Sequence, residues 1–149
     1  MALVNNMEPQ TESGVTSSFS LKSDISELSV LAENIENFGN DNGISDKTVF
    51  ELNLVLDELF TNLVSYGCQS DRHNFEIILK LKDGLLTLWI QDDGHKFNPL
   101  EAPEPDMECA CEERKIGGLG IHFMRKIMDS IEYAWVDGKN KLKLTKNIQ

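Results

Sequence analysis

The sequence has few basic residues, few cysteines and no long apolar stretch. Lysine and arginine together number 14 against 25 aspartates and glutamates, which gives a formal net charge of −11. Such a surface repels a phosphate backbone, so direct nucleic-acid binding is not expected. No apolar stretch is long enough to cross a bilayer, and the first residues lack the features of a signal peptide. We therefore expect no membrane partner and a cytoplasmic location.

The cysteines do not form a recognisable framework. There are three, Cys68, Cys109 and Cys111, and an odd number argues against a set of disulfides. Cys109 and Cys111 could begin a metal site, but zinc knuckles normally have two residues between their cysteines and need a second pair. A metal-sensing role for this segment is kept as an alternative.

The length and composition indicate one globular domain. The chain has 149 residues, of which 40% are hydrophobic and 26% charged. Residues 1–14 are polar and show little apolar periodicity. We therefore expect a flexible N-terminal tail over residues 1–14 and a single domain over residues 15–149.

Apolar periodicity predicts helices in the first half of the domain. Residues 15–21 could form a short edge strand, after which Ser23 or Asp24 offers an N-cap for a first helix. Gly39 and the Asn40–Gly43 stretch are expected to end that helix. A second helix is predicted from a cap at Ser45 or Asp46 to about residue 66.

The second half alternates between strands, a loop and a helix. Two hairpins are predicted, with turns at Asp83–Gly84 and Asp137–Gly138. Between them lie a Pro- and Glu-rich loop over residues 95–116 and a helix over residues 119–128. This order predicts an α+β fold: a two-layer sandwich with helices on one face of a mixed, largely antiparallel sheet. The lysines of the last strand are interpreted as a solvated sheet edge.

The second helix carries the first candidate chemistry. Glu58 and Asn62 are one helical turn apart, so a carboxylate and an amide oxygen can converge on one hard cation. The alternative is that both belong to the solvent face of an amphipathic helix.

A strand end and a glycine-rich segment supply two more candidates. Asp92, followed by Gly94, can present an acceptor to the exocyclic amine of adenine, or it can be an ordinary polar turn. The segment Gly117–Gly118–Leu119–Gly120 precedes a helix, where exposed backbone N–H groups stabilise phosphate. It matches neither a Walker loop nor a dinucleotide fingerprint, and its alternative is a hinge ending a lid loop.

The joint order of these segments resembles a known family. A Glu-x-x-x-Asn helix, an Asp-x-Gly strand end, a long loop and a Gly-Gly-Leu-Gly helix start resemble the Bergerat ATP-binding fold of histidine kinases, gyrase, Hsp90 and MutL. Within it, Leu56–Asn62, Asp92–Pro99 and Gly117–Met124 look most like the small anti-sigma-factor serine kinases of the RsbW and SpoIIAB type.

The resemblance implies roles for individual residues. It implies that Asn62 coordinates Mg²⁺, with Glu58 as a second candidate ligand, and that Glu58 orients or deprotonates the attacking hydroxyl. It implies that Asp92 binds the adenine amine, that Gly94 lets the base approach, and that Gly117, Gly118, Leu119 and Gly120 wrap the phosphates of ATP. The implied partners are a STAS-domain anti-anti-sigma protein and a sigma factor, with a homodimer as a possible assembly.

Two positions depart from the family pattern. Lys96 stands where the family usually has a second glycine, although its ammonium could also meet a phosphate. Asn140 stands where a threonine near the adenine is common, and it can still form hydrogen bonds. The alternatives to a serine/threonine kinase are a catalytically inactive nucleotide-binding module and the catalytic domain of a histidine kinase.

Overall fold

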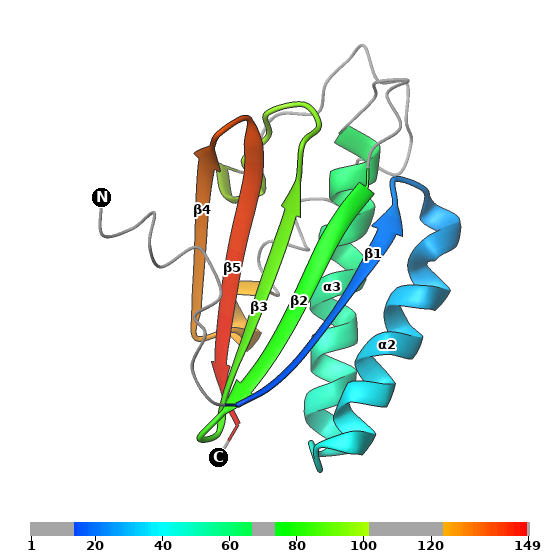
Figure 1. The fold of residues 1–149 in the computed structure, drawn as a ribbon, viewed down its shortest axis with the longest axis vertical. Helices are drawn as coiled ribbons and strands as arrows, with labels where there is room; N and C mark the ends of the chain where they lie inside the picture. Colours follow the sequence, from blue (N-terminus) through cyan, green and yellow to red (C-terminus); the bar gives the residue numbers. More distant parts are fainter. Residues whose placement is uncertain (1–13, 67–73, 102–123, 149) are drawn as a thin grey trace.

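The chain folds into a sheet covered on one face by two long helices. The computed structural model describes residues 14–66, 74–101 and 124–148. Figure 1 shows α2 and α3 on the same face of the sheet, which confirms the expected α+β two-layer sandwich. The elements are β1 (Val15–Lys22), η1 (Ile25–Glu27), α2 (Leu28–Asp41), α3 (Asp46–Tyr66), β2 (Asn74–Lys82), β3 (Leu85–Asp92), η2 (Pro99–Glu101), β4 (Ser130–Val136) and β5 (Lys139–Asn147).

Every strand pairing among the described residues is antiparallel. The five strands lie in the order β1-β2-β3-β5-β4, so β1 is the edge strand that the sequence indicated. The interpretation of the β5 lysines as a sheet edge is wrong. Strand β5 lies between β3 and β4, where Leu142 and Leu144 are buried and Lys141 is buried as well.

Both hairpin turns have the backbone that their Asp-Gly sequences predict. Asp83 and Gly84 have φ angles of 52° and 79°, and Asp137 and Gly138 have φ angles of 53° and 75°. Left-handed φ at both central residues matches the right-handed twist of the flanking strands. The two turns set the β2–β3 and β4–β5 registers.

The boundaries of α3 follow the predicted cap, and those of α2 need two corrections. Asp24 caps the short η1 and accepts a hydrogen bond from the Ser26 backbone N–H at 2.9 Å, whereas α2 begins after Glu27, which makes no side-chain capping bond. At the start of α3, Ser45 accepts a hydrogen bond from the Thr48 N–H at 3.2 Å. Gly39 itself lies inside α2, which ends at Asp41, within the Asn40–Gly43 stretch that was expected to end it. A Cβ at Gly39 would lie 2.5 Å from the Val49 Cγ2 atom, so this glycine allows α2 and α3 to pack closely.

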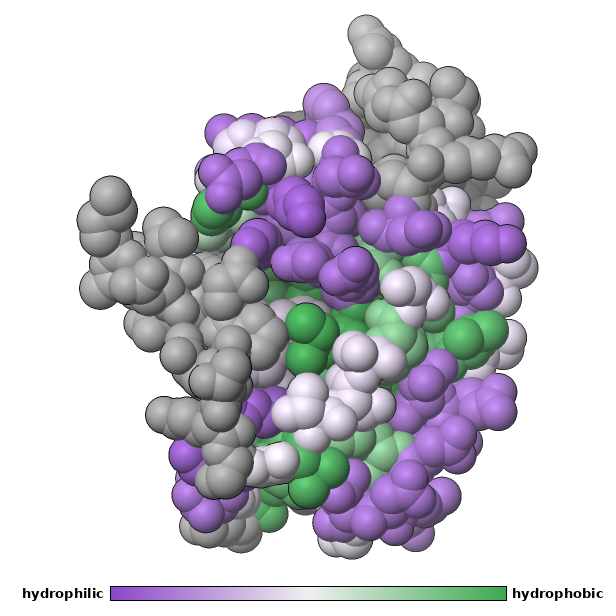
Figure 2. Space-filling model, viewed as in Figure 1, coloured by the Kyte–Doolittle hydropathy of each residue, from purple (hydrophilic) through white to green (hydrophobic). Residues whose placement is uncertain are grey.

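A single apolar core lies between the helices and the sheet. Its fully buried members include Ile35, Val55, Leu59, Phe75, Ile77, Leu79, Leu88, Met124 and Leu144. The opposite face of the sheet is mixed in character. Figure 2 shows hydrophilic residues gathered over the end of the sheet where β3 ends and β5 begins.

No helix within the described residues has both the length and the hydropathy needed to span a membrane.

Candidate functional site

The pairing of β3 with β5 places the first two residues of the site beside each other. Asp92, the last residue of β3, lies directly opposite Asn140, the second residue of β5. Both side chains are buried, with 8% and 5% of their residue surface exposed. A buried carboxylate needs donors, and Asp92 Oδ1 accepts from the Gly94 N–H at 2.9 Å and from Asn140 Nδ2 at 3.1 Å. The Asp-x-Gly turn is therefore held in one conformation.

Asn140 uses the full hydrogen-bonding capacity of its amide. Besides Asp92, its Nδ2 donates to the His95 carbonyl at 2.8 Å. Its Oδ1 accepts from the Phe97 N–H at 3.0 Å and from the Tyr133 hydroxyl at 2.5 Å. An amide offers two donor hydrogens and two lone pairs, so these four contacts saturate it. In this structure Asn140 positions the segment after β3, while its direct contact with a nucleotide stays a prediction.

Tyr133 is a site residue that sequence reasoning missed. The sequence predicts it only as part of the second hairpin, yet its hydroxyl reaches Asn140. Burial raises the pKa of the Tyr133 phenol, and the negative charge of Asp92 raises it further. A tyrosine among apolar strand residues needs a partner for its hydroxyl, and that signal could have identified it.

The segment after β3 returns to the helix layer. Asn98 Oδ1 accepts from the Leu100 N–H at 2.9 Å, which shapes the start of η2. Phe97 and Leu100 pack against the core, and η2 contacts α3. The Asp92 strand end and α3 are therefore parts of one region. Figure 1 shows that β3 and α3 both end, and β5 begins, at the same end of the molecule.

Helix α3 carries Glu58 and Asn62 in its second half, which runs toward the end of the molecule where β3 also ends. Asn62 is 5% exposed, so the interpretation of this stripe as a purely solvated helix face does not hold for it. Glu58 is half-buried, and burial raises the pKa of its carboxyl, with a smaller contribution from the neighbouring Asp57 charge. One turn of helix separates the two side chains. Mg²⁺ usually takes one or two protein oxygens together with phosphates and water, which this pair could supply.

Lys96 contacts an aromatic ring. Its ammonium lies 5.8 Å from the centroid of the Trp135 ring, and Trp135 is directly opposite Asn140 in the β4–β5 register. An exposed cation–π contact of this kind contributes about 0.5–1 kcal/mol. The contact of Lys96 with a phosphate, which the sequence allowed, stays a prediction.

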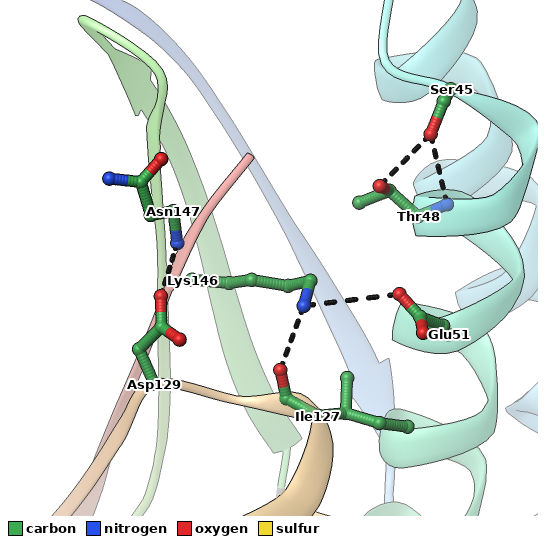
Figure 3. Close-up of polar contacts among 7 residues, drawn as sticks. All are labelled: Ser45, Thr48, Glu51, Ile127, Asp129, Lys146 and Asn147. Carbon is green, nitrogen blue, oxygen red and sulfur yellow. Dashed lines mark hydrogen bonds and ion pairs between the residues drawn. The ribbon is translucent and has the colours of Figure 1, made fainter. Parts of the chain in front are cut away.

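The helical residues 124–127 are anchored to α3 and β5. Figure 3 shows Lys146 between Ile127 and Glu51: its Nζ donates to the Ile127 carbonyl at 2.8 Å and lies 3.9 Å from a Glu51 carboxylate oxygen. A lysine at a helix C-terminus satisfies an end carbonyl and complements the helix dipole. Asp129 accepts from the Asn147 N–H at 2.6 Å and fixes the following turn.

The remaining predicted site residues lie outside the described residues. These are Gly117, Gly118, Leu119 and Gly120, and Cys109 and Cys111 lie outside as well. Their phosphate-binding and metal-sensing roles stay predictions. Within residues 14–66, 74–101 and 124–148, no three His, Cys, Asp or Glu side chains gather as a metal site would require.

Comparison with known proteins identifies the family of this chain. The model of the histidine kinase-like ATPase domain matches residues 21–146, which include both long helices, β3 and all of β5 except its last residue. The chain belongs to this family. Membership implies that it binds ATP, and it confirms the fold that the sequence motifs indicated.

One related protein is similar to this chain over most of its length. The chain is 31% identical over 135 residues to the serine/threonine-protein kinase BtrW of Bordetella bronchiseptica, covering 85% of this chain and 94% of BtrW. Among solved structures, the histidine kinase AdeS of Acinetobacter baumannii superposes with a TM-score of 0.46 at 14% identity, over 99% of this chain and 73% of AdeS. That similarity is too low to add to the argument. The similarity to a serine/threonine-protein kinase therefore rests on BtrW, and the membership of the histidine kinase-like ATPase family rests on the family match.

Proposed function

We propose that this chain is a magnesium-dependent serine/threonine protein kinase that acts as a regulator. Its substrate is a STAS-domain anti-anti-sigma protein, and its second client is a sigma factor or a similar regulator. The observation that carries the proposal is the similarity to BtrW, which is named a serine/threonine-protein kinase and is matched over 94% of its length.

The arrangement of Glu58 supports a role as general base. Phosphoryl transfer needs mainly positioning of the reactants and stabilisation of charge, plus a group that orients the hydroxyl nucleophile. Burial raises the pKa of the Glu58 carboxyl, which makes its ionised form a stronger base toward a serine or threonine hydroxyl. Its partial exposure leaves it reachable by a protein substrate.

Asn62 and Glu58 supply the oxygens that would hold Mg²⁺ beside the phosphates. When bound, the metal neutralises charge on the transferred phosphoryl group. Asp92 supplies the acceptor for the adenine amine, and its contacts with Gly94 and Asn140 hold that acceptor in place before the nucleotide arrives. A preorganised acceptor lowers the cost of ordering the site upon binding.

Transfer of a labelled phosphate tests the proposal. The wild-type chain is incubated with γ-labelled ATP, magnesium and a STAS-domain protein that co-purifies with it. We expect label on the partner that survives acid, because phosphoserine and phosphothreonine are stable there. The Glu58→Gln variant should lose transfer by roughly 10²–10⁴-fold, whereas Glu33→Gln on the exposed surface of α2 should not.

Two other outcomes identify the alternatives. Label that is lost in acid would identify a phosphohistidine product and a histidine kinase. Tight ATP binding without any transfer would identify an inactive interaction module.

A further inference from the structure

A groove between the two long helices is not used by the proposed chemistry. It is lined by Leu28, Leu31 and Ala32 of α2 and by Phe50, Asn53, Leu54 and Asp57 of α3, and its volume is about 290 Å³. Four of its seven lining residues are large or branched hydrophobics. Phe50 is 68% exposed, although burial of a phenylalanine is normally favourable by about 1.5–3 kcal/mol.

The size of the groove suits side chains rather than a whole ligand. Pockets for small molecules typically measure about 300–1,000 Å³, so this groove is at the lower limit. A helical segment laid into a hydrophobic groove anchors itself by residues at i, i+3, i+4 and i+7. Phe50, Leu54 and Asp57 follow the same spacing along α3 and form one wall of the groove.

The charges around the groove indicate the chemistry of its occupant. Asp57 is the ionisable side chain among the lining residues. Helix α2 carries three carboxylates and no basic residue, and α3 carries four carboxylates and one lysine, Lys47. Such a surface attracts cationic partners and repels anionic ones. A second copy related by two-fold symmetry would bring the same acidic helices face to face, which opposes self-association here.

We propose that the α2–α3 groove docks an amphipathic helix of a protein partner, with apolar anchors against Phe50 and Leu54 and a lysine or arginine paired with Asp57. Within the proposed function, this partner is the kinase's protein substrate or client. Glu58 follows Asp57 in the chain, about 100° further round the helix. A segment docked on Asp57 is therefore held beside the carboxylate proposed to act as base.

A labelled peptide tests the docking directly. The probe is a fluorescent helical peptide of about 18 residues, or five turns, with leucines at i, i+3, i+4 and i+7 and lysines on the flanks. We expect it to bind the full chain, with anisotropy that falls as salt rises. The Phe50→Ala variant should weaken binding roughly tenfold or more, the scale of a hot-spot residue. Val30→Ala, an exposed α2 position that does not line the groove, should match the wild type.

Asp57 is probed through the peptide, because its charge also acts on Glu58. A peptide with its lysines replaced by glutamates should bind at least tenfold more weakly to the wild type, the effect of like charges brought together. The docking proposal is contradicted if a scrambled peptide of the same composition binds equally well, or if Phe50→Ala has no effect. It is also contradicted if sedimentation shows a dimer that Phe50→Ala dissociates, since the occupant would then be a second copy.

ATP titration of the same proteins separates this inference from the proposed function. Phe50→Ala should bind ATP as the wild type does, because Phe50 lies outside the Asp92–Asn140 network. Peptide binding in a chain that fails to bind ATP would overturn the proposed function and leave the groove proposal standing.

Discussion

At the scale of the single residue, the buried amide of Asn140 holds four groups together. Replacing it by alanine removes hydrogen bonds to Asp92, His95, Phe97 and Tyr133. Each of these hydrogen bonds contributes about 1 kcal/mol net to the free energy of unfolding. Leaving the buried Asp92 carboxylate without one of its donors costs more. We expect Asn140→Ala to lower the free energy of unfolding by about 2–4 kcal/mol in urea denaturation.

Tyr133→Phe is the matched control for that measurement. It removes a single hydrogen bond to Asn140, so the expected loss is about 1 kcal/mol. An Asn140→Ala variant as stable as the wild type would show that the network does not hold the strand end in solution.

Glu58 gives a second prediction at this scale, on pH dependence. Because the folded-state pKa of its carboxyl is raised, the folded chain binds the proton more tightly than the unfolded chain. Its ionisation therefore lowers stability as pH rises through that pKa. Glu58→Gln removes this cost, so we expect a small rise in Tm at about pH 7.5 that disappears toward about pH 4, where glutamates are protonated.

The exposed α2 substitution Glu33→Gln is the control for this pH series. It should leave Tm unchanged at both pH values. An unchanged or lower Tm for Glu58→Gln at neutral pH would mean that the carboxylate is stabilised by its surroundings, against the direction of its pKa shift.

At the scale of the element, the contact between α2 and α3 depends on the absence of a side chain at Gly39. Alanine is normally about 1 kcal/mol better than glycine inside a helix. Here its Cβ would meet the short, branched side chain of Val49 at 2.5 Å, so the helices would have to move apart. We expect Gly39→Ala to destabilise the chain by about 1–3 kcal/mol in urea denaturation.

Asn37→Ala in the same helix is the comparison. Asn37 is exposed, so its replacement should be neutral or slightly stabilising. If Gly39→Ala were stabilising to the same degree, the close approach of the two helices would be refuted.

Elements with strong local signals could be predicted from the sequence. The bounds of α3 follow from Ser45 and the leucine periodicity, and both hairpins follow from their Asp-Gly turns. The sequence did not give the exact end of α2, because a glycine such as Gly39 often ends a helix. Gly39 instead allows α2 to pack closely against Val49 of α3, and the sequence of α2 alone does not show that contact.

The sequence predicted individual residues of the candidate site, but not the hydrogen bonds that join them. Asp92, Asn62 and Glu58 could be chosen because their residue types and order resemble a family pattern. The contact of Asn140 with Asp92 joins residues 48 positions apart and depends on the β3–β5 register. Tyr133 was missed because its hydroxyl reaches Asn140 on the neighbouring strand β5, and alternation along β4 alone gives no partner.

At the scale of the whole molecule, the end of the sheet where β3 ends and the helix α3 form the region that is expected to bind ATP. The family match covers residues 21–146, and η2 joins the Asp92 strand end to α3. The groove between α2 and α3 lies on the same helix as Glu58, so nucleotide and protein partner would approach one helix from different sides. In the proposed function, Asp92 would recognise adenine and Asn62 would bind magnesium, and the two properties should be separable by mutation.

Titration with a fluorescent ATP analogue tests this account most directly. It is performed with and without magnesium on the wild type, Asp92→Asn and Asn62→Ala. We expect Asp92→Asn to weaken binding in both conditions by roughly tenfold or more, about 1.4 kcal/mol for one lost charge-assisted hydrogen bond. Asn62→Ala should bind like the wild type without magnesium and lose most of the gain that magnesium gives. Equal affinities for all three proteins in both conditions would contradict the account.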